Sequence, residues 1–82
     1  MDLRKKNKYE TVILDFISDR LRALRAERGV TLASTGLPTS TLYNVENAVY
    51  MPTLFTLMQI AKAYDMPLSE LLSGLENLVW QD

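Results

Sequence analysis

The stretch that decides the fold is "GLPTSTLYNVENAVYMPTLFTL", residues 36–57. Pro38 and Pro52 each stand before a run whose apolar residues recur every three or four positions, the spacing of an amphipathic helix that begins at proline. This pattern predicts one helix over about 38–48 and a second that opens at 52–53, joined by an apolar connection. The stretch has no Lys or Arg, and its only formal charge is Glu46. Attraction to an anionic partner therefore has to come from elsewhere in the chain.

A long amphipathic helix precedes this stretch and is expected over residues 9–28. Its apolar residues, at helical spacing, are Tyr9, Val12, Ile13, Phe16, Ile17, Leu21 and Leu24. Gly29 supplies the left-handed residue that commonly ends a helix. Thr31 is placed to cap the next helix, but Gly36 and Pro38 follow so closely that only a short turn fits.

Two more helices are expected after Pro52. The first has a broad apolar face and should be buried; that face contains Leu54, Leu57, Met58, Ile60, Ala61 and Tyr64. The second is short, begins near Pro67 and stops at Gly74. Because no strand-like alternation appears, the fold class is all-α, a small bundle of four to five helices. We divide the chain into a flexible basic arm (1–8), one domain (9–74) and a C-terminal tail (75–82).

Composition disfavours most enzyme classes. The 82 residues include no Cys and no His, the commonest nucleophilic, basic and metal-binding side chains. No glycine-rich phosphate loop and no activated Ser or Thr is recognisable. We therefore expect no enzyme, no cofactor, no metal and no small-molecule ligand. No window approaches the ~18 apolar residues of a membrane span, so a cytoplasmic protein without a membrane partner is expected.

Charge is distributed unevenly along the chain. The net charge is -1, yet residues 1–28 hold eight of the nine basic residues and only five of the ten acidic ones. Any electrostatic attraction to phosphate must therefore come from the arm and the first helix. The competing interpretation is that these basic residues form a solvated face, paired with Asp15, Asp19 and Glu27.

Three blocks in order, "DRLRALRAERGVTL", "GLPTSTLYNVEN" and "MPTLFTLMQIAKAYDMPLSELL", resemble the helix-turn-helix domain of the Cro/C1 phage-repressor type, also called the xenobiotic-response-element family. The resemblance covers about residues 17–73 and implies a lambda-repressor-like fold that binds double-stranded DNA. It makes Pro38–Asn47 the recognition helix in the major groove. The DNA-contacting residues that it implies are Thr31, Thr39, Ser40, Tyr43 and Asn44, with Arg20 and Arg28 on the phosphates. The charge distribution adds Lys5, Lys6 and Lys8 of the basic arm as phosphate contacts.

The chain departs from the family pattern in two places. Gly29 and Glu46 are 17 residues apart, about one helical turn fewer than in the family. The loss falls in the first helix of the helix-turn-helix pair, which we expect to be re-angled or reduced to a single turn. After the recognition helix, where the family often has Gly and basic residues, this chain has the apolar run 48–51.

Two functions follow from these features. The first is a sequence-specific DNA-binding transcriptional regulator. The alternative is a protein-interaction or dimerisation module on a modified helix-turn-helix scaffold, with an interface that includes Tyr50 and Met51. In the simplest structural reading, Thr39 and Ser40 only cap their helix, Tyr43 is a half-buried packing ring, and the loop packs internally.

The tail adds apolar residues outside the shared core: Leu75, Leu78, Val79 and Trp80. They need a cover. One option is that the tail folds back onto the first helix beside Tyr9, Ile13 and Phe16. The other, which we favour from the sequence, is a symmetric homodimer in which tail and first helix meet their copies.

Overall fold

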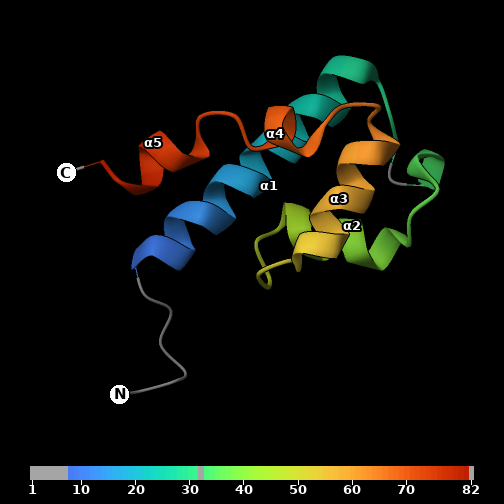
Figure 1. Cartoon of the computed structure of the whole chain (residues 1–82). Coiled ribbons are helices and arrows are strands. Elements are labelled where there is room, and N and C mark those ends of the chain that lie inside the picture. The colour runs from blue at the N-terminus through green and yellow to red at the C-terminus, as the bar shows by residue number, and fades with distance from the viewer. Residues whose placement is uncertain (1–7, 32, 82) are drawn as a thin grey trace.

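The computed structural model describes residues 8–31 and 33–81, and within them the chain is helical with no strand (Figure 1). The elements are α1 (Lys8–Arg28), the 3-10 turn η1 (Ala33–Thr35), α2 (Thr39–Glu46), α3 (Leu54–Ala63), α4 (Leu68–Leu71) and α5 (Leu75–Val79). The all-α prediction is confirmed. The loss of a turn between Gly29 and Glu46 reduces the helix before α2 to the three residues of η1.

Helix α1 is the longest element and supplies one side of the core. It ends at Gly29, whose φ of 63° is left-handed, and the N–H of Val30 closes the end by donating to the carbonyl of Arg25 at 3.1 Å. Its buried residues are Leu14, Ile17, Ser18, Leu21 and Leu24. Tyr9, the first residue of the predicted apolar stripe, is exposed and lies outside the core.

The core lies between α1, α2 and α3 and is closed at one end by α4. Its buried members are Ile17, Leu21, Leu24, Leu42, Val45, Leu57, Ile60, Ala61, Tyr64 and Leu71. Because a side chain from every one of these four helices enters the same cluster, the orientation of α2 is fixed by packing.

Helix α3 begins where the sequence predicts. The Thr53 hydroxyl caps it by accepting a hydrogen bond from the N–H of Thr56 at 3.1 Å. The prediction of a fully buried apolar face is wrong for Leu54 and Met58, which lie exposed beside Phe55. The apolar face of α3 is therefore wider than the core that it covers.

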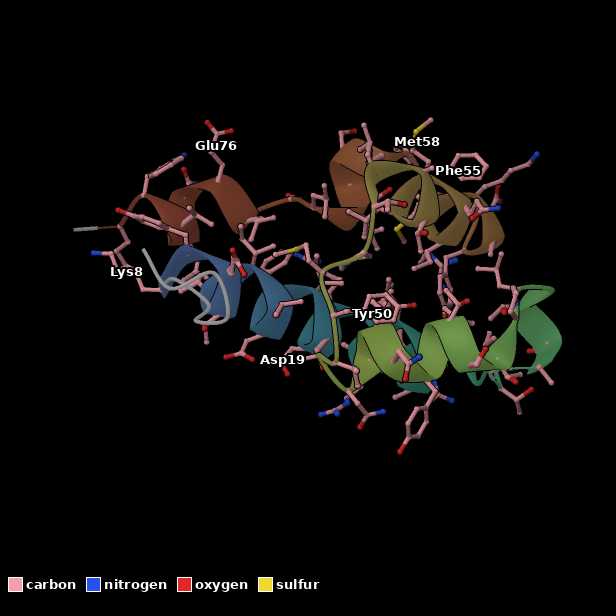
Figure 2. All side chains as sticks on the ribbon, turned by 90° about the horizontal axis from the view of Figure 1, so that it is seen from below. Lys8, Asp19, Tyr50, Phe55, Met58 and Glu76 are labelled. Carbon is pink, nitrogen blue, oxygen red and sulfur yellow. The ribbon has the colours of Figure 1, made fainter. Side chains whose placement is uncertain are left out.

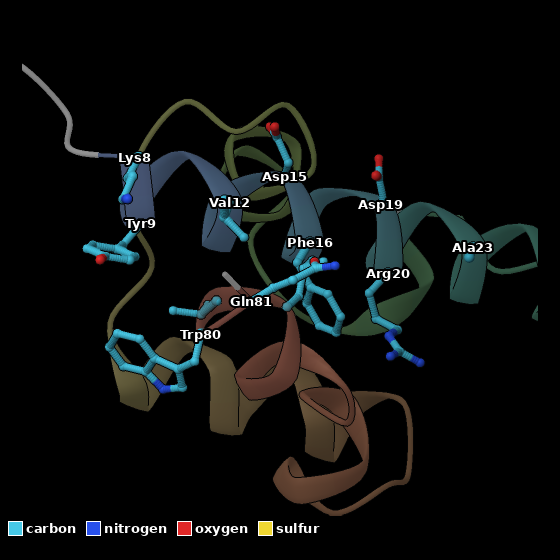
Figure 3. A pocket seen from close by; sticks show the side chains of 12 residues that line it. Lys8, Tyr9, Val12, Asp15, Phe16, Asp19, Arg20, Ala23, Trp80 and Gln81 are labelled. Atoms are coloured by element: carbon cyan, nitrogen blue, oxygen red, sulfur yellow. The ribbon is translucent and has the colours of Figure 1, made fainter.

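The tail forms α5 and packs against α1, which is the fold-back option (Figure 1). The rings of Tyr9 and Trp80 lie 5.5 Å apart between centroids, and Leu75 and Val79 are half-buried. An open groove of about 940 Å³ remains between the two helices, with Phe16 and Trp80 along its walls (Figure 3). The fold-back covers the tail only in part, because Leu78 and Trp80 stay exposed.

Candidate nucleic-acid interface

Helix α2 has one buried side and one exposed side. Leu42 and Val45 point into the core and are almost fully buried. Thr39 and Ser40 lie exposed on the first turn, and the Tyr43 side chain is 58% exposed. The interpretation of Tyr43 as a half-buried packing ring is therefore wrong. Asn44, the fourth predicted DNA-contacting residue on this helix, is partly buried.

The first turn of α2 leaves its hydroxyl groups unused. The residue at the cap position is Pro38, which has no side-chain hydrogen bond to offer; its carbonyl accepts from the N–H groups of Thr41 and Leu42. The interpretation of Thr39 and Ser40 as capping residues is therefore wrong. Among the described residues neither hydroxyl has a hydrogen-bond partner, so both are free to donate to or accept from a ligand.

The acidic charge of α2 is hidden in the interior. Glu46 is only 3% exposed, and its Oε2 accepts a hydrogen bond from Nε of Arg25 at 2.8 Å. This bond is the main reason that the pKa of Arg25 is raised above its ordinary value. The Ser18 hydroxyl donates to the backbone carbonyl of Glu46. The end of α2 is thus fastened to α1, and no carboxylate of α2 faces outward to repel phosphate.

A second contact supports the same end of α2. The side-chain amide of Asn47 donates to the carbonyl of Tyr43 at 2.7 Å, and its oxygen accepts from Arg22 at 3.3 Å. Arg22 is exposed and lies beside α2, and it is one of the basic residues of the N-terminal part of the chain that could attract phosphate, although the family resemblance does not assign it to DNA. The signal for it is helical spacing: Ser18, Arg22 and Arg25 share the side of α1 that contacts α2.

The shortened element before α2 is held by a reciprocal pair of hydrogen bonds. The N–H of Ser34 donates to the Thr31 hydroxyl at 3.2 Å, and the N–H of Thr31 donates to the Ser34 hydroxyl at 3.1 Å. The prediction that Thr31 caps a short turn is confirmed. Its hydroxyl is occupied by this cap, while the residue itself remains exposed.

The arginines that the resemblance assigns to phosphate already bind backbone carbonyls. Arg20 donates to the carbonyl of Ser73 at 2.6 Å and lies over the ring of Phe16 (Figure 3). Arg28 donates to the carbonyl of Tyr64. Each guanidinium has five donors, so both keep capacity for another acceptor. Within the described chain neither forms the expected ion pair with Asp15, Asp19 or Glu27.

Of the predicted basic arm, Lys5 and Lys6 lie outside the described residues. Lys8 is the first residue of α1, and its ammonium lies 5.2 Å from the ring centroid of Tyr9. The structure therefore places one of the three lysines at the far end of α1, beside α5 and away from the α2 end of that helix (Figure 2).

A family model described as "Helix-turn-helix" matches residues 21–71, more than half of the chain. The chain belongs to the Cro/C1-type helix-turn-helix family. The match begins within α1 and ends with α4, so the first part of α1 and all of α5 lie outside it. No curated protein and no solved structure matches the chain.

In this helix-turn-helix domain the connection after α2 is apolar and exposed. Val49, Tyr50 and Met51 all lie exposed, and Pro52 is buried. The interpretation that this loop packs internally is therefore wrong for Val49, Tyr50 and Met51. Ala48 takes a φ of 55°, a conformation that favours glycine.

The described residues contain no cluster of carboxylates that could hold a metal ion. None of their helices is long and apolar enough to cross a membrane.

Proposed function

We propose that the chain is a sequence-specific DNA-binding transcriptional regulator that inserts α2 into the major groove. The observation that carries this proposal is the outward side of α2: Thr39, Ser40 and Tyr43 are exposed, while Glu46 is buried and paired. Hydroxyls can bond phosphate or base edges, and Asn44 offers the amide that pairs with adenine. Helix-turn-helix proteins place this helix in the groove.

The electrostatic part of the affinity comes from other elements. Arg22 lies next to the end of α2, and Lys5, Lys6 and Lys8 belong to the basic N-terminal region. Because few cations are available, binding should be weak, and the part of the affinity that these cations supply should fall as salt concentration rises. We propose that the protein acts in the cytoplasm. We also propose that it forms a homodimer, because apolar side chains remain exposed on α3 and α5.

Selection from a random-sequence DNA pool at low salt tests this function. We expect an enriched sequence, and we expect Thr39→Ala with Ser40→Ala to lower affinity for it by roughly thirtyfold, since each of the two lost hydrogen bonds is worth about 1 kcal/mol. Replacing Lys5, Lys6 and Lys8 by Ala should instead reduce the salt slope by about one for each lysine that contacts a phosphate. A pool without enrichment would contradict the proposal.

The second candidate is a protein-interaction module, and the exposed apolar loop favours it. Val49, Tyr50 and Met51 expose apolar area without any cation. In that case Tyr50→Ala or Met51→Ala would abolish binding to a protein partner and leave the melting temperature unchanged. The measurement is a pull-down from lysate of the source cells, with wild type and variant compared as bait. A parallel wild-type pull-down is treated with DNase. If the treatment removes the captured protein, that protein was held through DNA and not through the loop.

A further inference from the structure

The side of α2 that faces away from the core carries polar and aromatic groups but no formal charge. The helical repeat places Ser40, Tyr43, Asn44 and Asn47 on this side. The helix has no Lys or Arg, and its one carboxylate, that of Glu46, is only 3% exposed. A ligand that approaches this side therefore meets hydroxyls, amides and one ring.

Two amides lie on this side, and the folded chain uses only one of them. The Asn47 side chain donates to the carbonyl of Tyr43 at 2.7 Å and accepts from Arg22 at 3.3 Å, so both ends of its amide are occupied. Asn44 is partly buried, and among the described residues its side-chain amide has no hydrogen-bond partner. Asn44 thus presents a donor and an acceptor side by side on a helix that is packed in place.

The cations of the described residues make their contacts away from the first turn of α2. Arg25 is bound to the buried Glu46, and Arg22 reaches the C-terminal end of α2 through Asn47. The others contact different elements: Lys8 and Arg20 line the groove between α1 and α5, Arg28 binds the carbonyl of Tyr64 at the end of α3, and Lys62 lines a groove beside α4. In helix-turn-helix proteins the N-terminal residues of this helix contact the base edges.

We propose that the base pairs read by α2 are A·T pairs, an assignment that rests on the proposed function and specifies the DNA it recognises. Each base shows a different pattern in the major groove. Guanine is read by Arg or Lys through O6 and N7, and cytosine by a carboxylate that accepts from N4. The exposed side of α2 has neither group. Hydroxyls bond to either kind of base pair and do not discriminate between them.

Asn44 supplies the contact with adenine. Its Nδ2 donates to N7 of the base while its Oδ1 accepts from N6, so the contact requires both ends of the amide. A bidentate pair of this kind discriminates against a wrong base by about 5- to 150-fold. Asn47 cannot make the same contact, because its amide is already bonded at both ends within the chain.

Tyr43 supplies the contact with thymine. Its side chain is 58% exposed and precedes Asn44 on the same side of α2. The C5-methyl of thymine is an apolar group in the major groove, and aromatic side chains pack on it. Cytosine has no methyl at this position, so the ring favours thymine over cytosine. The amide and the ring therefore both select A·T pairs.

Selection from the random-sequence pool gives the first test, with wild type, Asn44→Ala and Tyr43→Ala. We expect A·T pairs at every position whose preference changes in either variant. Asn47→Ala is the matched control and should keep the wild-type preference. Arg22→Ala should weaken binding to all sequences alike. Circular dichroism checks that each variant keeps its helices.

The outcomes of this selection separate the A·T assignment from the proposed function. A G·C pair whose preference disappears in Asn44→Ala or Tyr43→Ala would overturn the A·T assignment and leave the proposed function standing. An enriched sequence that is the same for all the proteins would also overturn the assignment. A pool without enrichment would overturn the proposed function itself.

Base analogues in the selected duplex test the contacting atoms and need no variant for their first arm. Replacing each adenine in turn by 7-deazaadenine removes N7 and keeps the base pair. At one position this should weaken wild-type binding about fivefold, as expected for one lost hydrogen bond. The loss at that position should be absent in Asn44→Ala, since the contact is already missing.

Uracil in place of thymine removes the C5-methyl alone. We expect wild-type binding to weaken about fourfold at the contacted position, the worth of one buried methyl group, and binding of Tyr43→Ala to stay unchanged there. Fluorescence anisotropy at low salt measures both series. A selected site that is rich in A·T pairs but insensitive to both analogues would show that DNA shape is read instead, and it would overturn the assignment to Asn44 and Tyr43.

Discussion

Ala48 illustrates at the scale of one residue how the chain departs from an ideal helix ending. It follows α2 with a φ of 55°, and a Cβ in this left-handed conformation costs about 1–2 kcal/mol. Glycine avoids that cost but loses about 0.5–1 kcal/mol through its freer unfolded chain. The two terms act in opposite directions, and the first is larger.

We therefore expect Ala48→Gly to raise the free energy of unfolding by about 0.5–1 kcal/mol. Urea denaturation measures this difference, and Ala63→Gly, in the last turn of α3, is the matched control that should destabilise. An Ala48→Gly variant that is less stable than wild type would show that the left-handed residue is not a source of strain.

Tyr64 is a second residue with an effect of its own, because it is only 2% exposed and its hydroxyl has no hydrogen-bond partner among the described residues. Burial, followed by the charge of Glu46, raises the pKa of Tyr64 above its ordinary value near 10, while Arg25 and Arg28 act in the opposite direction. The neutral phenol is the form that the folded state favours. Its contribution to stability is full below pH ~10 and is lost as pH rises toward the folded-state pKa.

Tyr64→Phe should accordingly be as stable as wild type at neutral pH or more stable by about 1 kcal/mol, since it removes an unsatisfied buried hydroxyl. It should also lose less stability than wild type when pH is raised above ~10. Thermal melts across that range, with Tyr43→Phe as an exposed control, provide the measurement. Equal alkaline losses in wild type and Tyr64→Phe would assign the effect to other groups.

At the scale of elements, α2 depends on α1 more than on the short turn that precedes it. Arg25 binds Glu46, Ser18 binds the carbonyl of Glu46, and Arg22 binds Asn47, so three residues of α1 hold the last turn of α2. The turn η1 has only three residues and none of them is fully buried. A shortened helix before α2 is tolerated because these contacts with α1 hold α2 in place.

Glu46→Gln tests whether the ion pair of Arg25 with Glu46 stabilises the contact of α1 with α2. The substitution keeps the shape of the buried Glu46 side chain but removes its charge, which weakens the bond from the partly exposed Arg25. We expect a melting temperature lower by a few degrees. The exposed Glu76→Gln serves as the matched control, and an equal effect of the two substitutions would show that the ion pair does not stabilise the contact of α1 with α2.

The ends of the helices could be predicted from local chemistry, but which of their apolar faces would be covered by another helix could not. Gly29 stops α1 and Thr53 caps α3 as the sequence indicates, since both effects act within a few residues. Periodicity marked Leu54 and Met58 as apolar, yet it cannot say whether another helix covers them. The structure shows that none of the described helices does so.

The candidate site was predictable to a similar degree. The exposed side of α2 was correctly assigned for Thr39, Ser40 and Tyr43. The carbonyl partners of Arg20 and Arg28 are 53 and 36 residues away, and no local pattern encodes contacts over that distance. For the same reason, the burial of Glu46 against Arg25 had to come from the structure.

At the scale of the whole molecule, two parts of the structure have different tasks. We propose that the exposed side of α2 binds DNA, while the contact of α5 with α1 closes the end of the domain that lies outside the family match.

The most direct test of the central claim measures DNA binding by fluorescence anisotropy, with wild type and Tyr43→Ala at low salt on the sequence selected from the random pool. If α2 enters the groove, Tyr43→Ala should weaken binding by roughly fivefold or more, as the loss of about 1 kcal/mol predicts. Glu76→Gln, far from α2 on α5, should not change it. Equal affinity for wild type and Tyr43→Ala, Thr39→Ala and Ser40→Ala would contradict the assignment of α2 as the DNA-binding element.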